Sequence, residues 1–325
     1  MEDLESRALQ QFDKLVQRGS IIFKDAPPVH IPARPFNVRE RYDHAFLRTA
    51  SLSAAVLPSG ENGQELQFRI ASSLTKKPQV EIKEAETQPR KPQDKPSPFA
   101  NDPPDFVLEH VGPEHTLRFN KFCVVRPQFV LHTNEFKPQI EPLAATDLAA
   151  AWSVLCRLES PYIVIYNGGM QGGWSLPHRH MQLLPRPPRD VHDLFPDTYG
   201  IQNGVFLNIH PLLGKIFKWQ TSTDSQIQHA VRMLPQSPTE EQIFSIYNDL
   251  LTAAGVSETD YSHNLVLVRE WMLVIPRSRA SQEGVKIVNA AGMVGMIWIP
   301  SNDVLDIWLQ SSNPMDILAR FGKPW

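Results

Sequence analysis

The feature that most constrains this chain is a strand, a glycine-rich turn and a second strand that follow one another near its middle. Residues 161–166 are almost entirely apolar, and residues 167–173 contain four glycines. After that turn come His178, His180 and Gln182, at a strict spacing of two residues. Because successive side chains of a β-strand point to opposite faces, we expect these three polar groups to lie together on one face. Two imidazoles and a carboxamide beside a loop of backbone N–H groups are suited to chemistry on a phosphate.

Hydrophobic patterns elsewhere predict an α+β fold, in which helices flank a largely antiparallel sheet. The expected helices cover residues 2–18, a segment capped by Thr146 and Asp147, a segment from Ser237 to Gly255, and a last segment capped by Asp303. The expected strands cover residues 66–70, 122–125, 129–133, 161–166, 264–268 and 271–275. The helices stand between groups of strands rather than after every strand, which favours this class over a doubly wound parallel fold.

The chain divides into two expected parts. Residues 1–204 contain the His-x-His-x-Gln motif, and residues 205–325 form a second part that we expect to pack with the first as one compact unit. Within the first part, residues 76–104 are rich in proline and mixed charges and poor in apolar residues. A segment of that composition predicts a long loop at the periphery of the fold.

Composition excludes several classes of function. The 325 residues include 32 basic and 35 acidic ones, a net charge of −3, so no overall positive field attracts nucleic acid. Cys123 and Cys156 are the only cysteines, which argues against a disulfide framework and fits a reducing compartment. No apolar run approaches the roughly 18 residues of a membrane span, and the acidic Glu2, Asp3 and Glu5 are unlike a targeting peptide. We therefore expect a cytoplasmic protein that binds neither membranes nor nucleic acid.

The paired histidines leave three interpretations open. They can lie on the solvent face of a strand without a function, or they can bind a metal ion such as zinc. A third metal ligand would come from His192, His210 or a carboxylate, and the spacing selects none of them. The third interpretation is nucleophilic catalysis by a histidine on a phosphoryl group. The adjoining glycines favour it, because such a turn lets a phosphate approach backbone N–H groups closely.

Residues 178–184 (His-Arg-His-Met-Gln-Leu-Leu) resemble the signature of the histidine-triad superfamily, with glutamine in place of the last histidine. That replacement is typical of the transferase branch of the superfamily rather than of its hydrolases. The fuller string from Tyr166 to Gln182 is similar to that of the fungal ATP adenylyltransferases, also called diadenosine tetraphosphate phosphorylases. Further similar blocks lie at residues 68–78, 120–125, 133–136, 264–279, 289–292 and 295–296. The resemblance covers nearly the whole chain, in order, and implies a histidine-triad-like fold.

The resemblance implies a nucleotidyltransferase that converts diadenosine 5',5'''-P1,P4-tetraphosphate and phosphate into ATP and ADP, reversibly. His180 would be the nucleophile and would carry the adenylyl group, and His178 would orient the segment by hydrogen bonding. Gln182 can donate an amide N–H to a phosphate oxygen but cannot deliver a proton. The implied substrate-binding residues are Asn120, Lys121, Asn167, Gly168, Gly169, Gly172, Gly173, Ser175, Arg277, Arg279 and Lys76.

The same resemblance sets the expected ligands. A dinucleoside polyphosphate, ATP, ADP and phosphate are the expected partners, and a monomer is the expected state. We expect a divalent cation, Mg²⁺, to arrive with the charged substrate, with no metal-binding side chain and no organic cofactor in the protein. Phosphate and sulfate both stay open as the acceptor anion.

The chain departs from the family pattern at three positions beside the expected phosphates. Gly168 stands where serine is usual, Leu176 where glutamine is usual, and Trp174 is bulkier than the usual small residue. These departures leave open a nucleotide-binding protein with altered catalysis. A sugar-1-phosphate uridylyltransferase or a hydrolase of the superfamily is the other alternative. The uridylyltransferases usually have a proline between the two histidines, where this chain has Arg179.

Overall fold

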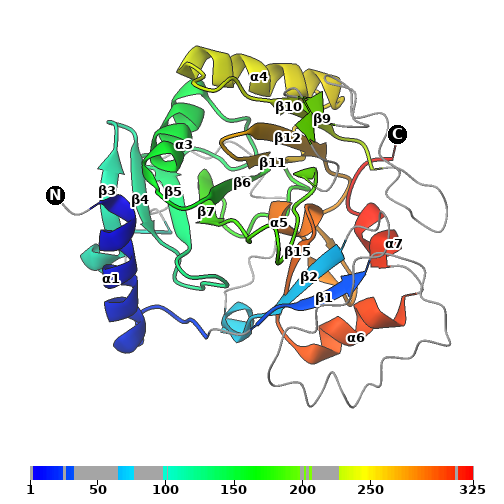
Figure 1. The fold of residues 1–325 in the computed structure, drawn as a ribbon, viewed down its shortest axis with the longest axis horizontal. Helices are drawn as coiled ribbons and strands as arrows, with labels where there is room; N and C mark the ends of the chain where they lie inside the picture. The colour runs from blue at the N-terminus through cyan, green and yellow to red at the C-terminus, as the bar shows by residue number, and fades with distance from the viewer. Residues whose placement is uncertain are drawn as a thin grey trace.

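An antiparallel sheet of eight strands forms the centre of the molecule in the computed structural model (Figure 1). The structure describes residues 3–24, 27–32, 65–76, 98–100, 102–197, 201–202, 205–206, 227–311 and 314–324. The order across the sheet is β10 (Ala230–Met233), β12 (Trp271–Pro276), β11 (His263–Leu267), β6 (Tyr162–Gly168), β7 (His180–Pro185), β5 (Phe129–Thr133), β4 (His115–Phe119) and β3 (Val107–Val111). All neighbouring pairs run antiparallel, which confirms the predicted class.

Smaller sheets and helices surround the central sheet. A three-stranded sheet contains β1 (Val29–Pro32), β2 (Glu65–Ile70) and β15 (Met296–Ile299). Two-stranded sheets contain β8 (Ile201–Gln202) with β9 (Val205–Phe206) and β13 (Ser281–Gln282) with β14 (Lys286–Ile287). The helices are α1 (Leu4–Gln17), α3 (Ala145–Arg157), α4 (Glu240–Ala253), α5 (Ala290–Met293), α6 (Asn302–Gln310) and α7 (Pro314–Ala319), with 3₁₀ turns η1 (Ser72–Lys76) and η3 (Pro104–Phe106). Within the described ranges, none of these helices has the length and apolar character needed to span a membrane.

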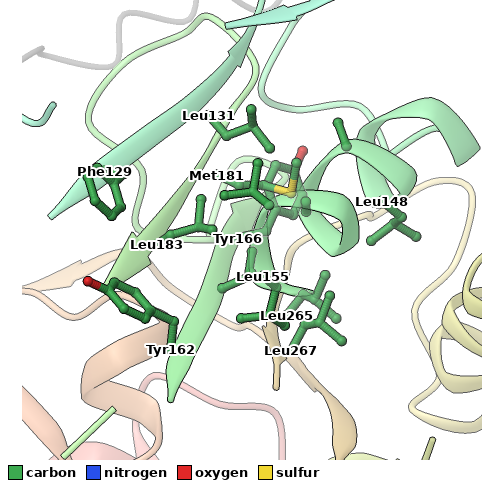
Figure 2. Packing of buried hydrophobic residues seen from close by; sticks show 14 of the residues in the cluster. Phe129, Leu131, Leu148, Leu155, Tyr162, Tyr166, Met181, Leu183, Leu265 and Leu267 are labelled. Atoms are coloured by element: carbon green, nitrogen blue, oxygen red, sulfur yellow. The ribbon is translucent and has the colours of Figure 1, made fainter. Parts of the chain in front are cut away.

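Strand β7 shows how one face of the central sheet is built. Met181 and Leu183 belong to a core between the sheet and helices α1, α3 and α4. Figure 2 shows these two side chains beside Phe129 and Leu131 of β5, with Leu155 of α3 close by. Since side chains alternate along a strand, His180 and Gln182 must point to the opposite face.

That opposite face is divided between a second apolar core and a polar area. Helix α5 packs against β6 and β11, and β2, β15, α6 and α7 contribute to the same apolar core, on the side of the sheet away from α3 and α4 (Figure 1). On β4, β5 and β7 the same face carries Arg118, His132, His180 and Gln182 instead, because Arg118 pairs with Val130 and His132 pairs with His180. The candidate site lies in this polar area.

Side-chain caps set the N-terminal starts of helices α1 and α4. Helix α1 begins where a side-chain oxygen of Asp3 accepts the backbone N–H of Ser6 at 2.8 Å. The expected helix at Ser237 begins later, because Thr239 and Gln242 accept each other's backbone N–H groups in a capping box. The amphipathic patterns were therefore right about both helices, and the start of α4 was misplaced.

Two further helices begin differently from the prediction. Helix α3 starts at Ala145, and Asp147 accepts the backbone N–H of Ala144 at 2.7 Å from within the first turn. Asp303 likewise lies inside the first turn of α6, which Ser301 precedes. Helix α7 follows, so α6 is not the last helix.

The expected strand over residues 122–125 is wrong. Phe122 makes an isolated bridge with Ile22, and the remaining residues form a loop. The side-chain oxygen of Asn120 accepts the N–H of Phe122, and that of Gln128 accepts the N–H of Val124. Side chains thus satisfy backbone groups that a strand would pair with another strand, and the strand of this region is β4 instead.

The central sheet takes strands from both expected parts of the chain. Strands β3 to β7 come from residues before 204, and β10 to β12 come from residues after 205. The boundary at 204 and 205 stays a prediction, and a single sheet runs through both parts.

Candidate active site

His180 opens strand β7, and hydrogen bonds hold both its backbone and its ring. Its backbone N–H donates to Oε1 of Gln139 at 2.7 Å, and Nε2 of Gln139 donates to its carbonyl oxygen at 3.1 Å. The residue is 5% exposed, and its Nδ1 lies 2.7 Å from the carbonyl oxygen of His178. Because a carbonyl oxygen can only accept, Nδ1 of the neutral ring carries the proton and Nε2 carries the lone pair. Hydrogen bonds to Gln139 and to His178 therefore fix both the backbone of His180 and the tautomer of its ring.

Gln139 holds His180 at the point where the sheet divides. The pairing of β6 with β7 stops at Ile165 and Gln182, whereas β7 continues to pair with β5 as far as His180. Beyond that point Nε2 of Gln139 donates to the carbonyl oxygen of Asn167 in β6 at 2.8 Å, in addition to that of His180. A side chain thus bridges the diverging ends of the two strands.

Gln182 shares the face of His180, as the alternation predicted. Its Oε1 accepts a hydrogen bond from Nε2 of Gln128 at 2.7 Å and a longer one from Nδ2 of Asn120 at 3.5 Å. The residue is 7% exposed. Asn120, predicted to bind substrate, thus contacts the site through Gln182.

His178 lies just before β7, in an isolated bridge, and its ring centroid is 5.5 Å from that of His132, so it lies on the same face as His180. Its Nε2 lies 3.0 Å from Oγ1 of Thr133 and 3.1 Å from the carbonyl oxygen of Glu135. Burial lowers the pKa of His178, which keeps the ring neutral near pH 7. His178 therefore connects the turn after β5 to the ring of His180, which its carbonyl oxygen orients.

Three histidines of this face surround one aromatic ring. The ring centroid of Phe99 is 4.2 Å from that of His132, 5.5 Å from that of His178 and 6.4 Å from that of His180. His132 lies directly opposite His180 in the register of β5 and β7. Burial lowers the pKa of His132 to about 3, so this ring is neutral at physiological pH.

Arg118 of β4 holds Phe99 in this position. Its guanidinium group donates to the carbonyl oxygen of Phe99 at 3.2 Å and lies 5.0 Å from the ring centroid. It also donates to a carboxylate oxygen of Asp102 at 2.5 Å. Within residues 76–104, which we expected to form a peripheral loop, Phe99 is held against the sheet because a buried arginine binds its backbone and its ring.

The glycine turn is packed against the rest of the chain. Gly169 and Gly173 have positive φ angles of 72° and 83°. A Cβ atom on Gly173 would lie 2.5 Å from the carbonyl oxygen of Val288, and one on Gly172 would lie 2.3 Å from the carbonyl oxygen of Gly168. Glycine is required here because the neighbouring backbone leaves no room for a side chain.

Side chains of the scaffold also occupy polar atoms of this turn. Nδ2 of Asn264 donates to Oδ1 of Asn167 at 3.0 Å and to the carbonyl oxygen of Gly172 at 2.8 Å. The backbone N–H of Ala290 donates to the same Oδ1 of Asn167 at 2.7 Å. Asn167 is 3% exposed, and its side-chain oxygen binds groups of the protein, so its predicted contact with a phosphate would come from Nδ2.

Arg277, predicted to bind the polyphosphate, is fully buried with 0% exposure. Its guanidinium group donates to a side-chain oxygen of Asn264 and to backbone carbonyl oxygens. Those carbonyl oxygens belong to Phe321 (2.9 Å), Arg279 (2.8 Å), Val288 (2.8 Å) and Gly172 (3.3 Å). Burial lowers its pKa to about 9, so the group still carries a charge at neutral pH. In this structure Arg277 supports the glycine turn.

The other predicted cations are exposed. Lys121, Arg279 and Lys76 lie on the surface, and Ser175 is half-buried. The structure thus brings His178, His180, Gln182 and Asn120 together. It places Asn167 and Arg277 in the scaffold of the turn that contains Gly168, Gly169, Gly172 and Gly173.

The fold accommodates two of the three departures from the family pattern, Trp174 and Gly168. Trp174 is 6% exposed, and its indole N–H donates to the carbonyl oxygen of Gly169 at 2.6 Å. A Cβ atom on Gly168 would lie 2.5 Å from Cε1 of Tyr166, so a serine there would require Tyr166 to move. The bulk of Trp174 is thus absorbed by the turn itself.

The metal interpretation has no support from ligand geometry in the part of the chain that the structure describes. No group of three or more His, Cys, Asp and Glu side chains gathers there to hold an ion. His192 is buried, and His210 lies outside the described residues.

Five residues of the site were not predicted from the sequence: Phe99, Arg118, Gln128, His132 and Gln139. Alternation along residues 129–133 places His132 on one face of a strand, but it does not reveal that β7 lies beside it. The two glutamines come from loops, where no periodicity indicates which way a side chain points.

Comparisons with known proteins now decide the family. The sequence profile of the Ap4A phosphorylase N-terminal domain matches residues 38–197, and that of the ATP adenylyltransferase C-terminal domain matches residues 223–324. Protein APA1 of Saccharomyces cerevisiae is 30% identical over 234 residues, which are 65% of this chain and 69% of that protein. The chain belongs to the Ap4A phosphorylase family. The family predicted from the sequence is thereby confirmed.

Further proteins that are similar to this Ap4A phosphorylase family member support the same assignment. Diadenosine 5',5'''-P1,P4-tetraphosphate phosphorylase 2 of Saccharomyces cerevisiae is 28% identical over 259 residues, 70% of this chain and 76% of that protein. The crystal structure of yeast Ap4A phosphorylase Apa2 in complex with Ap4A has a TM-score of 0.69 and 24% identity, covering 100% of this chain and 98% of that one. The complex of Apa2 with AMP has a TM-score of 0.67 and 22% identity, covering 100% and 97%. These structures share the fold of this family member.

Proposed function

We propose that His180 carries the adenylyl group while this chain converts diadenosine tetraphosphate and phosphate into ATP and ADP. The chain is a nucleotidyltransferase, as its family membership indicates. The observation that carries the role of His180 is the 2.7 Å contact between its Nδ1 and the carbonyl oxygen of His178. That contact leaves the lone pair on Nε2, the atom that must form a bond to phosphorus.

Two displacements complete the proposed reaction. In the first, the Nε2 lone pair of His180 attacks the α-phosphorus at one end of the substrate. The bond from that phosphorus to the bridging oxygen breaks, and ATP leaves with the electron pair. In the second, an oxygen of inorganic phosphate attacks the same phosphorus, the phosphorus–nitrogen bond breaks, and ADP forms. His180 regains its lone pair, and its Nδ1 proton stays in place throughout.

Gln182 is proposed to stabilise charge rather than to move a proton. An amide N–H can donate to a nonbridging phosphate oxygen, and it cannot act as an acid or as a base. A polyphosphate leaves without a strong acid, so positioning and charge stabilisation carry the step. Because Gln182 cannot act as a base, it does not activate water, which favours transfer to phosphate.

Exposed groups are proposed to bind the polyphosphate chain. The positive charges of Lys121, Arg279 and Lys76, the hydroxyl group of Ser175 and backbone N–H groups of the glycine turn are suited to phosphate oxygens. We expect Mg²⁺ to accompany the substrate as its counter-ion. We also propose that the protein works as a monomer in the cytoplasm.

Covalent trapping tests the role of His180. The protein is incubated, without phosphate, with diadenosine tetraphosphate radiolabelled at both α-phosphorus atoms. The sample for peptide mapping is then denatured and kept in alkali, because a phosphorus–nitrogen bond is labile to acid. We expect label on the wild-type protein, on the peptide that contains His180, and its release as ADP when phosphate is added. Adding sulfate in a parallel sample shows whether that anion is also an acceptor.

Two variants control the trapping experiment. His180→Ala should take up no label, whereas His110→Ala, at an exposed histidine of β3, should be labelled like the wild type. Phosphorolysis by the wild-type protein with no labelled adduct, or with label on another histidine, would contradict the proposal.

A further inference from the structure

We propose that Gln128 is a positioning residue, which decides that the amide nitrogen of Gln182, and not its oxygen, is offered to the reacting phosphate. This inference rests on the proposed function, in which Gln182 donates a hydrogen bond to a nonbridging oxygen. A carboxamide has an accepting end and a donating end of almost the same shape, so shape alone does not select between them. The selection must come from the hydrogen-bond partners of Gln182.

The direction of each hydrogen bond follows from a backbone group that has only one role. The N–H of Val124 can only donate, and it lies 2.8 Å from Oε1 of Gln128. The other end of that carboxamide, Nε2, therefore faces Gln182, at 2.7 Å from its Oε1. Since Nε2 of Gln128 can only donate, the atom of Gln182 beside it must be the oxygen.

The carboxamide of Asn120 is also oriented by a backbone N–H group, and it also points its nitrogen toward Gln182. The backbone N–H of Phe122 donates to Oδ1 of Asn120 at 2.9 Å, which turns Nδ2 of Asn120 toward Gln182. That Nδ2 lies 3.5 Å from Oε1 of Gln182, at the limit of hydrogen-bond distance. Both neighbouring side chains thus offer donors to one oxygen, and the shorter contact belongs to Gln128.

The consequence concerns the charge that Gln182 presents. With its oxygen bound to Gln128, the two N–H groups of Gln182 are the ones available on the face of His180. A donor stabilises the negative nonbridging oxygens in the transition state, whereas a carbonyl oxygen in the same place would repel them. Gln128 is 1% exposed and Gln182 is 7% exposed, so bulk water does not compete for these groups. Gln128 thereby acts on the reaction through Gln182.

The test is the substitution Gln128→Glu, which turns the donor into a titratable group of the same shape. When the new carboxyl group is protonated, its O–H can donate to Gln182 and its carbonyl oxygen can accept from Val124, as in the wild type. When it is ionised, it only accepts, so Gln182 must turn its N–H groups toward it and its oxygen toward the phosphate. Burial raises the pKa of such a carboxyl group above its ordinary value, so both forms are accessible.

We expect kcat for phosphorolysis by Gln128→Glu to be about 100-fold below that of the wild type at alkaline pH, the effect typical of losing one transition-state donor. The ratio of the two kcat values should recover as the pH falls through the raised pKa, and KM should change less than kcat. Gln128→Met, which has no donor and no charge, should lower kcat by about 10-fold with a ratio that does not depend on pH.

Gln67→Glu is the matched control, because Gln67 is also buried but lies in the three-stranded sheet. A buried carboxyl group with a raised pKa destabilises the folded state as the pH rises through that pKa, in either variant. Thermal unfolding at each pH monitors this, and kcat is measured well below the unfolding transition. We expect Gln67→Glu to lose stability with rising pH and to keep a constant kcat ratio.

A kcat ratio for Gln128→Glu that is independent of pH, or a kcat of Gln128→Met equal to that of the wild type, would overturn the inference. Failure of the proposed function looks different. In that case the wild-type protein itself would form no adduct on His180, whatever residue stands at position 128.

Discussion

The strand His180–Pro185 and the turn formed by residues 168–173 were both expected to contact phosphate. The two segments differ in which of their polar atoms form hydrogen bonds with the rest of the protein. On the strand, hydrogen bonds place the proton of His180 on Nδ1 and bind the side-chain oxygen of Gln182. On the turn, donors of the neighbouring scaffold bind the carbonyl oxygen of Gly172 and the side-chain oxygen of Asn167, which holds the turn in position. We therefore propose that one stretch of sequence contains a reactive part, the strand, and a supporting part, the turn.

The difference indicates that the glycines of the turn are required for close packing of the backbone, whether or not the turn also binds phosphate. Substitutions in the strand should change the chemistry with little effect on folding, and substitutions in the turn should do the reverse. Each prediction that follows tests this separation.

The largest effect is expected from His180→Ala. Removing the nucleophile should lower kcat by about 10⁴-fold or more, while the lost Nδ1 hydrogen bond should cost about 1 kcal/mol of stability.

Gly172→Ala should lower the free energy of unfolding by roughly 1–3 kcal/mol because the new methyl group meets backbone atoms. Its kcat per folded molecule should stay within about 10-fold of that of the wild type. Steady-state kinetics and urea unfolding measure both quantities, and near-normal turnover by His180→Ala would break the comparison.

A pair of arginines tests the supporting part. Arg277→Met would leave several buried carbonyl oxygens without donors, and we expect a loss of roughly 3–5 kcal/mol in the free energy of unfolding. Arg279→Met, at an exposed position, should leave that free energy within about 0.5 kcal/mol and should raise KM if its charge binds the polyphosphate. Denaturant unfolding of the two variants measures both free energies. Equal stabilities would show that Arg277 is not structural.

The smallest effect concerns pH. Burial lowers the pKa of His132 to about 3, so below the ordinary pKa of about 6.5 the unfolded chain binds a proton that the folded chain does not. Stability should therefore fall as the pH falls from about 6.5 toward 4. His132→Leu should make this slope shallower by up to about 1.4 kcal/mol per pH unit. Urea unfolding at several pH values measures it, and identical slopes in both proteins would contradict the neutral, buried state of His132.

The sequence could predict those parts of the site that depend on local periodicity. Alternation alone places His180 and Gln182 on one face. The environment of Arg277 could not be predicted, because an arginine has the same sequence appearance whether its donors meet phosphates or buried carbonyl oxygens. Gln128 and Gln139 were missed for another reason: each acts over a long separation in sequence, through loops that carry no periodic pattern.

The division of the sheet at His180 has a consequence for transplanting this chemistry. Residues 178–182 contain the proposed nucleophile and the proposed amide donor, but Gln139 and Gln128, which hold them in place, come from outside that segment. Copying the five-residue segment into another hairpin would supply the reactive groups without the partners that choose their proton and their orientation. A working transplant would need both glutamines and the fork between two strands that lets Gln139 enter.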